Sequence, residues 1–287
     1  MASAVVAAAL LLAGCGGNGA GEGGAEPDAG TGTIILATTT STQDSGLLDE
    51  LIPRFERESG YAVKTVAVGS GQALEIGERG EADVLLVHSP KAEEQLMQTG
   101  KAGQRRLVMH NDFILVGPGS DPAAVEGQPV TAAFERIAED RERFISRGDD
   151  SGTNTRELDL WEAAGIAPKG SWYEKSGLGM GATLGIAAEK RAYTLADRGT
   201  YLSTAGPRED LDVLVEGDER LLNVYHVIEM TQRASSRVQE AGGQAFARWI
   251  VSRPVQQTIG AFGRDEFGQA LFTPDAGKQE AELAAAG

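Results

Sequence analysis

The chain has 287 residues, of which 41% are hydrophobic and 24% charged, so it is long enough for two modest domains with apolar cores. Its formal net charge of −16 argues against nucleic acids and anionic membrane surfaces as partners. A buried site for a small anion stays possible, because local hydrogen-bond donors decide such a site whatever the total charge.

The N-terminus is a short apolar run that ends in Leu-Ala-Gly before Cys15, the only cysteine of the chain. This pattern resembles the lipobox of bacterial lipoproteins, in which the cysteine sulfur takes the lipid. A single cysteine excludes disulfides within the chain and Cys-metal clusters. We therefore predict a signal peptide over residues 1–14, then a lipidated Cys15 and a Gly-rich flexible tether over 15–32. The expected location is extracytoplasmic, at a membrane.

After the tether, apolar periodicity predicts an alternation of strands and helices. The expected strands are 33–38, 61–68 and 82–87, and the expected helices are about 45–60, 72–79 and 91–99. Pro53 falls inside the first helix, where we expect a kink or a shifted boundary. This order predicts a mostly parallel sheet with ligand-facing loops at the carboxyl ends of its strands. Three loops meet that description: 38–41, 69–71 and 88–90.

A second α/β pattern follows a strand expected at 111–117. Its predicted elements are helix 131–140, strand 143–146, a helix opened by Ser-Gly-Thr, helix 181–190, strand 192–196, strand 221–230, and helices 239–252 and 254–262. We predict two lobes, each a mostly parallel sheet flanked by helices, with two crossing strands as the hinge. Lobe 1 is expected to comprise 33–115 with 226–287, and lobe 2 to comprise 116–225.

The stretch 146–153 carries the clearest functional pattern. Arg147 precedes Ser151, Gly152 and Thr153, which open an amphipathic helix. A helix start offers unpaired backbone N–H groups and a partial positive charge, to which hydroxyls add donors and a guanidinium adds a counter-charge. Taken alone, the stretch is also consistent with an ordinary N-cap beside a surface arginine.

Further hydroxyls fall in the predicted ligand-facing loops. Thr40 and Ser41 follow a buried strand, and Ser70 lies between two glycines. These side chains are either turn hydroxyls or anion donors, and their place before helix starts favours the second interpretation. Thr183 is as well explained as a helix cap as by contact with a ligand.

Several segments together resemble the tungstate-binding proteins of bacterial ABC importers. They are Thr-Thr-Thr-Ser-Thr-Gln-Asp-Ser-Gly-Leu-Leu at 38–48, Val-Gly-Ser-Gly-Gln-Ala-Leu at 68–74, 146–153, Gly-Met-Gly-Ala-Thr-Leu at 179–184 and Ala-Tyr-Thr-Leu-Ala-Asp-Arg at 192–198. The resemblance implies a two-lobed, type II periplasmic-binding-protein fold that closes on one tetrahedral oxyanion. It also implies ABC permease subunits as partners, a monomer, no cofactor, no resident metal and no catalysis.

The Arg-x-x-x-Ser-Gly-Thr spacing also resembles phosphate-binding proteins, which use a carboxylate after an early strand to accept the proton of hydrogen phosphate. The corresponding loop here begins with His88 and has no Asp or Glu at its start. We therefore expect a fully deprotonated dianion such as tungstate, molybdate or sulfate. Only the neutral donors and Arg147 would then balance its charge.

Rival functions have weaker support. The segment 177–182 matches the Gly-x-Gly-x-x-Gly/Ala pattern of dinucleotide sites, but no clear buried strand precedes it. A phosphate or sulfate ester hydrolase would pair Ser41 or Ser89 with His88, yet no Gly-x-Ser-x-Gly elbow is present and the three histidines have no metal-binding spacing. A tethered oxyanion sensor, or a binding protein for phosphate or sulfate, remains an alternative.

Overall fold

The computed structural model describes residues 1, 32–205 and 210–283. The predicted signal peptide, Cys15 and all of the tether before residue 32 lie outside the described residues. Among the described residues, no helix is both long and apolar enough to cross a membrane.

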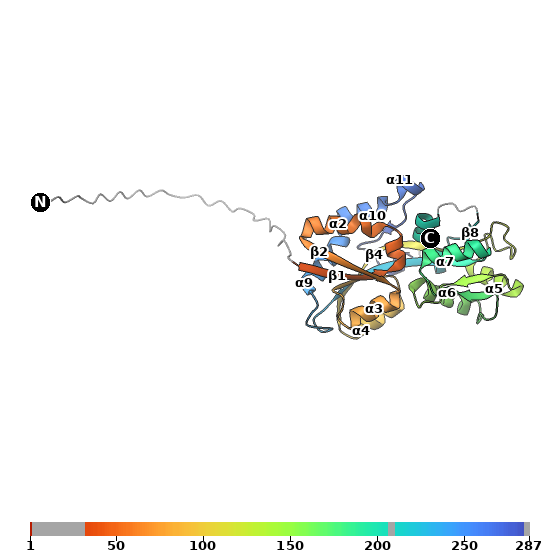
Figure 1. The fold of residues 1–287 in the computed structure, drawn as a ribbon, viewed down its shortest axis with the longest axis horizontal. Helices are drawn as coiled ribbons and strands as arrows, with labels where there is room; N and C mark the ends of the chain where they lie inside the picture. Colours follow the sequence, from red (N-terminus) through yellow and green to blue (C-terminus); the bar gives the residue numbers. More distant parts are fainter. Residues whose placement is uncertain (2–31, 206–209, 284–287) are drawn as a thin grey trace.

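Two lobes lie side by side along the long axis of the molecule (Figure 1). The first half of the chain forms β1(Gly32–Thr39), α1(Thr40–Asp44), α2(Leu47–Ser59), β2(Tyr61–Val68), α3(Ser70–Glu78), β3(Val84–Val87), α4(Pro90–Gln98), β4(Ala102–Gly117), α5(Val130–Asp140) and β5(Phe144–Ser146). The second half forms α6(Gly152–Ala163), β6(Tyr173–Lys175), α7(Met180–Lys190), β7(Thr194–Asp197), α8(Arg198–Thr200), η1(Tyr201–Ala205), β8(Asp212–Val215), η2(Glu219–Leu221), β9(Leu222–Met230), α9(Glu240–Ile250), α10(Arg253–Ala261), α11(Arg264–Phe267), β10(Thr273–Pro274) and α12(Glu280–Leu283).

The strands β4 and β9 pair antiparallel and connect the lobes, as the hinge prediction requires. The sheet that contains them is mixed. Parallel pairs join β1 to β2 and to β3, whereas β3–β9, β4–β10, β4–β7 and β4–β8 are antiparallel. A separate parallel pair joins β5 to β6. The mostly parallel arrangement that we expected thus holds within the strand–helix units and ends where the hinge strands enter.

Strand β4 begins nine residues earlier than the strand predicted at 111–117. Its first five residues, Ala-Gly-Gln-Arg-Arg, are half-buried or exposed and have no apolar alternation that could have indicated a strand. Helix α2 continues through Pro53, which has no backbone N–H and so removes one hydrogen-bond donor inside the helix. Its ends are marked by Gly46 and Gly60, both in the left-handed region at φ 80° and 78°.

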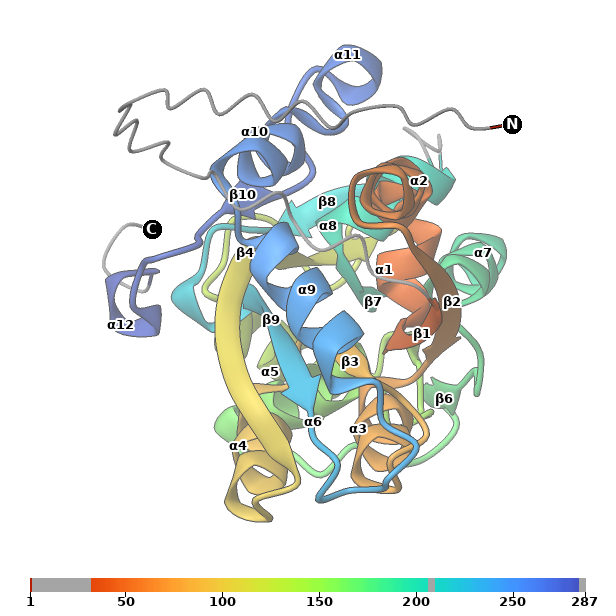
Figure 2. The same cartoon turned by 90° about the vertical axis from the view of Figure 1, so that its left-hand side faces the viewer.

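Lobe 1 has helices on both faces of its sheet (Figure 2). Helices α2, α9 and α10 pack on one face against side chains such as Leu36 and Leu86, and α3 and α4 pack on the other against Leu85 and Val87. Lobe 2 repeats this arrangement: α5 and α6 share a core with Phe113, while α7 lies on the opposite face. Successive strand residues face opposite layers, so the apolar strand runs fill both cores.

Candidate functional site

Helix starts from both lobes meet where the lobes face each other. Helices α1 and α3 begin directly after the parallel strands β1 and β2 of lobe 1, and α6 begins after β5 of lobe 2. Each helix leaves backbone N–H groups at its start without an intrahelical partner. The carboxyl ends of strands and the amino ends of helices therefore meet between the lobes, which is the usual ligand position in such sheets. This buried region between the lobes is called the cleft below.

Three hydrogen-bond donors in this cleft are buried and, within the described residues, have no partner. They are the hydroxyl of Ser70, the hydroxyl of Thr153 and Nε of Arg147. Ser70 comes from lobe 1, whereas Arg147 and Thr153 come from lobe 2. A Cβ placed on Gly152 would lie 2.9 Å from the Ser70 oxygen, so the start of α6 closely approaches that hydroxyl. Buried donors without partners cost free energy unless an acceptor enters the cleft.

The Arg147 side chain is 2% exposed and supplies the positive charge of the cleft. Its Nη2 donates to the hydroxyl oxygen of Thr40 in the other lobe over 3.2 Å and to Oδ2 of Asp149 over 2.6 Å. Asp149 also accepts the Ser151 N–H at 3.3 Å. Burial raises the pKa of the nearby Asp44 carboxyl, and the charge of Arg147 opposes that rise. The guanidinium thus remains attached to its own loop while its Nε stays free.

The other predicted residues of 146–153 and 38–41 also lie in the cleft. Ser151 caps α6 by accepting the Asn154 N–H at 3.2 Å, and Gly152 and Thr153 form the first turn of that helix. Ser41 is 1% exposed, and its hydroxyl lies 3.3 Å from Nε2 of His88. The structure therefore brings the predicted residues of both lobes to one place.

Thr183 differs from the other predicted residues. Its hydroxyl contacts the Ser176 hydroxyl at 2.8 Å and donates to the Gly179 carbonyl at 3.0 Å, at the start of α7. Its single proton is thereby used within lobe 2. Helix α7 has no side-chain cap at Gly179, and the Thr183 hydroxyl instead donates to the carbonyl four residues earlier, so the helix-cap alternative is not what the structure shows.

From the sequence, His88 was considered as a possible catalytic base and as the start of the loop that has no carboxylate, but not as a site residue. It follows β3 directly, is 4% exposed, and contacts hydroxyls at the end of β1. Burial lowers the pKa of His88 to about 4, and the nearby guanidinium of Arg147 adds to this effect. The imidazole is therefore neutral at pH 7. Its place at the head of the third ligand-facing loop was the signal that could have identified it.

Asp197 lies at the end of β7, facing the hinge, and is fully buried. Its Oδ2 accepts the Thr200 N–H at 2.8 Å, while its Oδ1 has no partner among the described residues. Burial raises the pKa of Asp197 to about 6, against the Thr200 hydrogen bonds and the charge of Arg147. From the sequence, this residue belongs to the 192–198 segment of the family resemblance, but it was not among the predicted site residues.

Glu157 stabilises the start of the loop that carries Arg147. The carboxylate is 2% exposed and accepts from Ser146 at 2.6 Å, Trp161 at 2.9 Å and Tyr173 at 2.7 Å. Burial raises the pKa of Glu157, and these donors lower it. The contacts hold the end of β5 against α6 and so fix where Arg147 leaves the strand.

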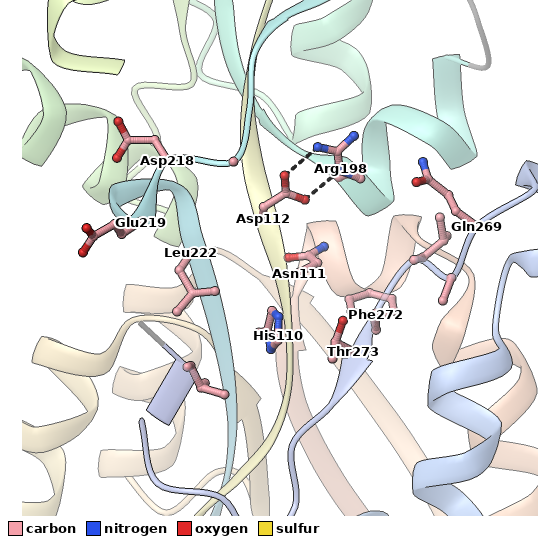
Figure 3. A pocket seen from close by; sticks show the side chains of 14 residues that line it. His110, Asn111, Asp112, Arg198, Asp218, Glu219, Leu222, Gln269, Phe272 and Thr273 are labelled. Atoms are coloured by element: carbon pink, nitrogen blue, oxygen red, sulfur yellow. Dashed lines mark hydrogen bonds and ion pairs between the residues drawn. The ribbon is translucent and has the colours of Figure 1, made fainter. Parts of the chain in front are cut away.

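A pocket of about 280 Å³ lies beside the hinge strands β4 and β9 (Figure 3). Its lining includes the carboxylates of Asp112, Asp218 and Glu219, and its arginine, Arg198, already pairs with Asp112 at 2.7 and 2.6 Å. Acidic walls around a neutralised arginine repel a dianion. The candidate oxyanion site is therefore the cleft that contains Arg147.

The fold and the cleft together define a two-lobed solute-binding protein, and the PBP superfamily domain matches residues 24–254. The chain is 48% identical to the tungstate-binding protein TupA of Peptoclostridium acidaminophilum over 96% of this chain and 97% of that protein. It therefore belongs to the family of tungstate-binding proteins within the PBP superfamily.

Two solved structures are also similar. The tungstate binding protein TupA from Desulfovibrio alaskensis G20 has 42% identity and a TM-score of 0.72, covering 86% of this chain and 100% of that one. The tungstate ABC transporter from Geobacter sulfurreducens has 41% identity and a TM-score of 0.73, covering 80% of this chain and 98% of that one. The expected family and the two-lobed fold class are thus confirmed.

Proposed function

We propose that this protein captures tungstate, or the closely similar molybdate, between its lobes and delivers it to an ABC importer. The observation that carries the proposal is the set of buried donors without partners around Arg147: the hydroxyls of Ser70 and Thr153 and the arginine Nε. Each would hydrogen-bond to an anion, and such bonds contribute about 1.5–3 kcal/mol apiece. The names of the relatives point to the same ligand.

The proposed ligand set is Thr40, Ser41, Ser70, Arg147, Ser151, Gly152 and Thr153, with Thr183 supporting the loop before α7. The oxyanion would be held through its oxygens, and no chemical step is needed. Helix-start N–H groups and hydroxyls take the place of water around it, because a single arginine cannot neutralise a dianion.

The contacts of His88 and Asp149 support a fully deprotonated ligand, because the side chains at these two positions already have partners. His88 stands where phosphate-binding proteins of this pattern carry a carboxylate, and its Nε2 already faces hydroxyls. The carboxylate of Asp149 is occupied by Arg147 and by the Ser151 N–H. A ligand that must donate a proton would therefore find no partner at these positions.

The proposed cellular setting is the outer side of a membrane, with Cys15 as the lipid attachment point and a monomer that docks on permease subunits. The proposed lobes are 33–115 with 226–287 and 116–225. Ligand-driven closing would create the surface that the permease recognises, since a ligand favours the state with which it makes more contacts.

The experiment is thermal unfolding of the full chain with tungstate, molybdate, sulfate or phosphate. A ligand at about 100 times its dissociation constant stabilises the folded state by about 2.7 kcal/mol. We expect a clear rise in Tm with tungstate and none with phosphate. A rise with phosphate alone would assign the protein to phosphate, a rise with sulfate alone would assign it to sulfate, and no rise with any anion would refute oxyanion binding.

A further inference from the structure

His88 occupies a position at the cleft that the proposed ligand set does not use. Its ring stacks on Tyr225 with centroids 4.7 Å apart and lies beside the start of α6, where a Cβ on Gly152 would be 2.8 Å from the ring carbon Cε1. Each ring nitrogen faces a different polar group: Nδ1 faces the hinge strand β9, and Nε2 faces the end of β1. The imidazole thus lies between the hinge and the hydroxyls of the cleft.

Asn223 on β9 determines which nitrogen carries the proton. Both of its amide hydrogens are used, because Nδ2 donates to Oδ1 of Asn111 at 2.7 Å and to the Tyr225 hydroxyl at 3.0 Å. Its Oδ1 lies 2.9 Å from Nδ1 of His88 and can only accept. Nδ1 of His88 therefore carries the hydrogen, and Nε2 is left with a lone pair.

That lone pair is shared by two hydroxyls. Nε2 lies 3.2 Å from the Thr39 oxygen and 3.3 Å from the Ser41 oxygen, which are 3.1 Å from each other. Thr39 also accepts the Thr42 N–H at 3.2 Å and contacts the Thr42 hydroxyl at 2.6 Å. When the Thr42 hydroxyl donates, both lone pairs of the Thr39 oxygen are filled, and its proton points to Nε2 or to Ser41.

Two proton arrangements satisfy this chain. In one, Thr39 donates to Ser41 and Ser41 donates to His88. In the other, Thr39 donates directly to His88, and the proton of Ser41 is free for a ligand. A bound anion selects the second arrangement because it attracts the Ser41 proton.

We propose that His88 is a positioning residue for oxyanion binding: its Nε2 accepts the Thr39 proton and thereby releases the Ser41 hydroxyl to donate to the ligand. This inference rests on the proposed function, which supplies the oxyanion. The residue itself need not touch the ligand. It would let Ser41 change partners without leaving a buried acceptor unpaired.

The charge state of the ring agrees with this role. Burial holds the pKa of His88 near 4, so the imidazole keeps its lone pair at neutral pH. A protonated ring would donate from Nε2, so Thr39 or Ser41 would have to accept from the ring instead of donating to it. The positive charges of Arg147 and Arg156 both lower the pKa of His88 and so disfavour its protonation.

A double-mutant cycle on the full chain tests the coupling, with tungstate affinity measured by calorimetry. His88→Leu removes the acceptor, and we expect the dissociation constant to rise about 10- to 100-fold, the value of one hydrogen bond to a charged group. His88→Gln keeps an acceptor and should stay within about threefold of the wild type. On a Ser41→Ala background, His88→Leu should cause little further loss, whereas on a Ser70→Ala background its effect should be undiminished.

Equal losses on both backgrounds would overturn the proposal, because a general packing defect does not depend on Ser41. Imidazole ¹⁵N chemical shifts of the wild type provide a second measurement that needs no mutant. We expect a neutral ring with Nδ1 protonated from pH 5 to 8, with and without tungstate. An Nε2–H tautomer would overturn the proposal even if tungstate binds tightly, whereas absence of tungstate binding by the wild type would instead refute the proposed function.

Discussion

Arg147 and Thr40 join the two lobes across the cleft: Nη2 of the arginine in lobe 2 donates to the hydroxyl oxygen of the threonine in lobe 1 over 3.2 Å. Because the Thr40 oxygen accepts this bond, its proton remains available to a ligand. Other hydrogen bonds also cross between the lobes, among them those from Thr200 to the Ser41 carbonyl at 3.3 Å and from Ser203 to the Asp44 carbonyl at 3.0 Å. The structure therefore represents a closed arrangement.

Replacing Arg147 should separate the contribution of its charge from that of its shape. Arg147→Ala removes the positive charge beside the Ser70 and Thr153 hydroxyls. It should weaken tungstate binding by about 1,000-fold, since removing one member of a buried charged pair costs about 2–5 kcal/mol. Arg147→Lys keeps the charge but cannot reach Thr40, Asp149 and the ligand together, so an intermediate loss of about 10- to 100-fold is expected. Calorimetric titration measures both, and equal affinity of the lysine variant and the wild type would contradict this role.

Thr153 and Thr183 form a matched pair of buried threonines. Thr153 has a hydroxyl without a partner, whereas the hydroxyl of Thr183 is bonded within lobe 2. Thr153→Val should therefore weaken tungstate affinity about 10- to 100-fold and leave the Tm of the ligand-free protein nearly unchanged. Thr183→Val should do the reverse, costing about 1–2 kcal/mol of stability with little effect on intrinsic affinity. Calorimetry with ligand-free melting curves distinguishes them, and an affinity loss in Thr183→Val alone would reverse the assignment.

Much of the site was predictable because its signals are local. The caps, glycines and hydroxyls of 146–153 and 69–71 lie within a few residues of the helix starts that they serve, so spacing alone indicates their role. The two-lobed fold followed from the order of strands and helices together with the family resemblance. The start of β4 was missed because its polar first five residues pair with β9 through backbone bonds, which leave no apolar pattern.

The parts that sequence reasoning missed depend on side-chain contacts and burial, which residue spacing does not express. The His88–Asn223 bond joins residues 135 positions apart, and only the sheet order that places β3 next to β9 brings them together. The bond of Asp149 to Arg147 is local, but nothing in the spacing shows that the carboxylate turns back onto the guanidinium. The raised pKa of Asp197 follows from burial, which a sequence motif does not express.

Gly152 lets the lobes approach each other. A Cβ there would lie 2.9 Å from the Ser70 oxygen and from Nδ1 of His88, closer than real side chains allow. Gly152→Ala should hold the cleft partly open, weakening tungstate binding about 10- to 100-fold without lowering the Tm of the ligand-free protein. Gly181→Ala is the control, because the nearest atoms to its Cβ all belong to the Thr204 side chain, the methyl carbon first at 3.3 Å. Small-angle scattering should show that tungstate compacts the control but not Gly152→Ala; compaction of both would contradict the prediction.

Asp197 should make the stability of the ligand-free protein depend on pH. Its pKa is about 6 in the fold against 3.8 for the ordinary group, so the folded state favours the protonated acid. The resulting stabilisation is complete below about pH 4 and is lost as the pH rises to about 6, an effect of about 3 kcal/mol. Asp197→Asn, whose amide oxygen can still cap α8, should therefore be more stable than the wild type at pH 7.5 but not at pH 4.

The same substitution removes a negative charge that acts on Arg147, so tungstate affinity at pH 7.5 should rise several-fold. Asp140→Asn, at an exposed position near the end of α5, should change neither quantity and serves as the control. Urea unfolding at the two pH values measures the free energy of unfolding, and calorimetry measures the affinity. If Asp197→Asn is destabilised equally at both pH values, the carboxylate acts mainly as a helix cap, and its burial does not govern the pH dependence.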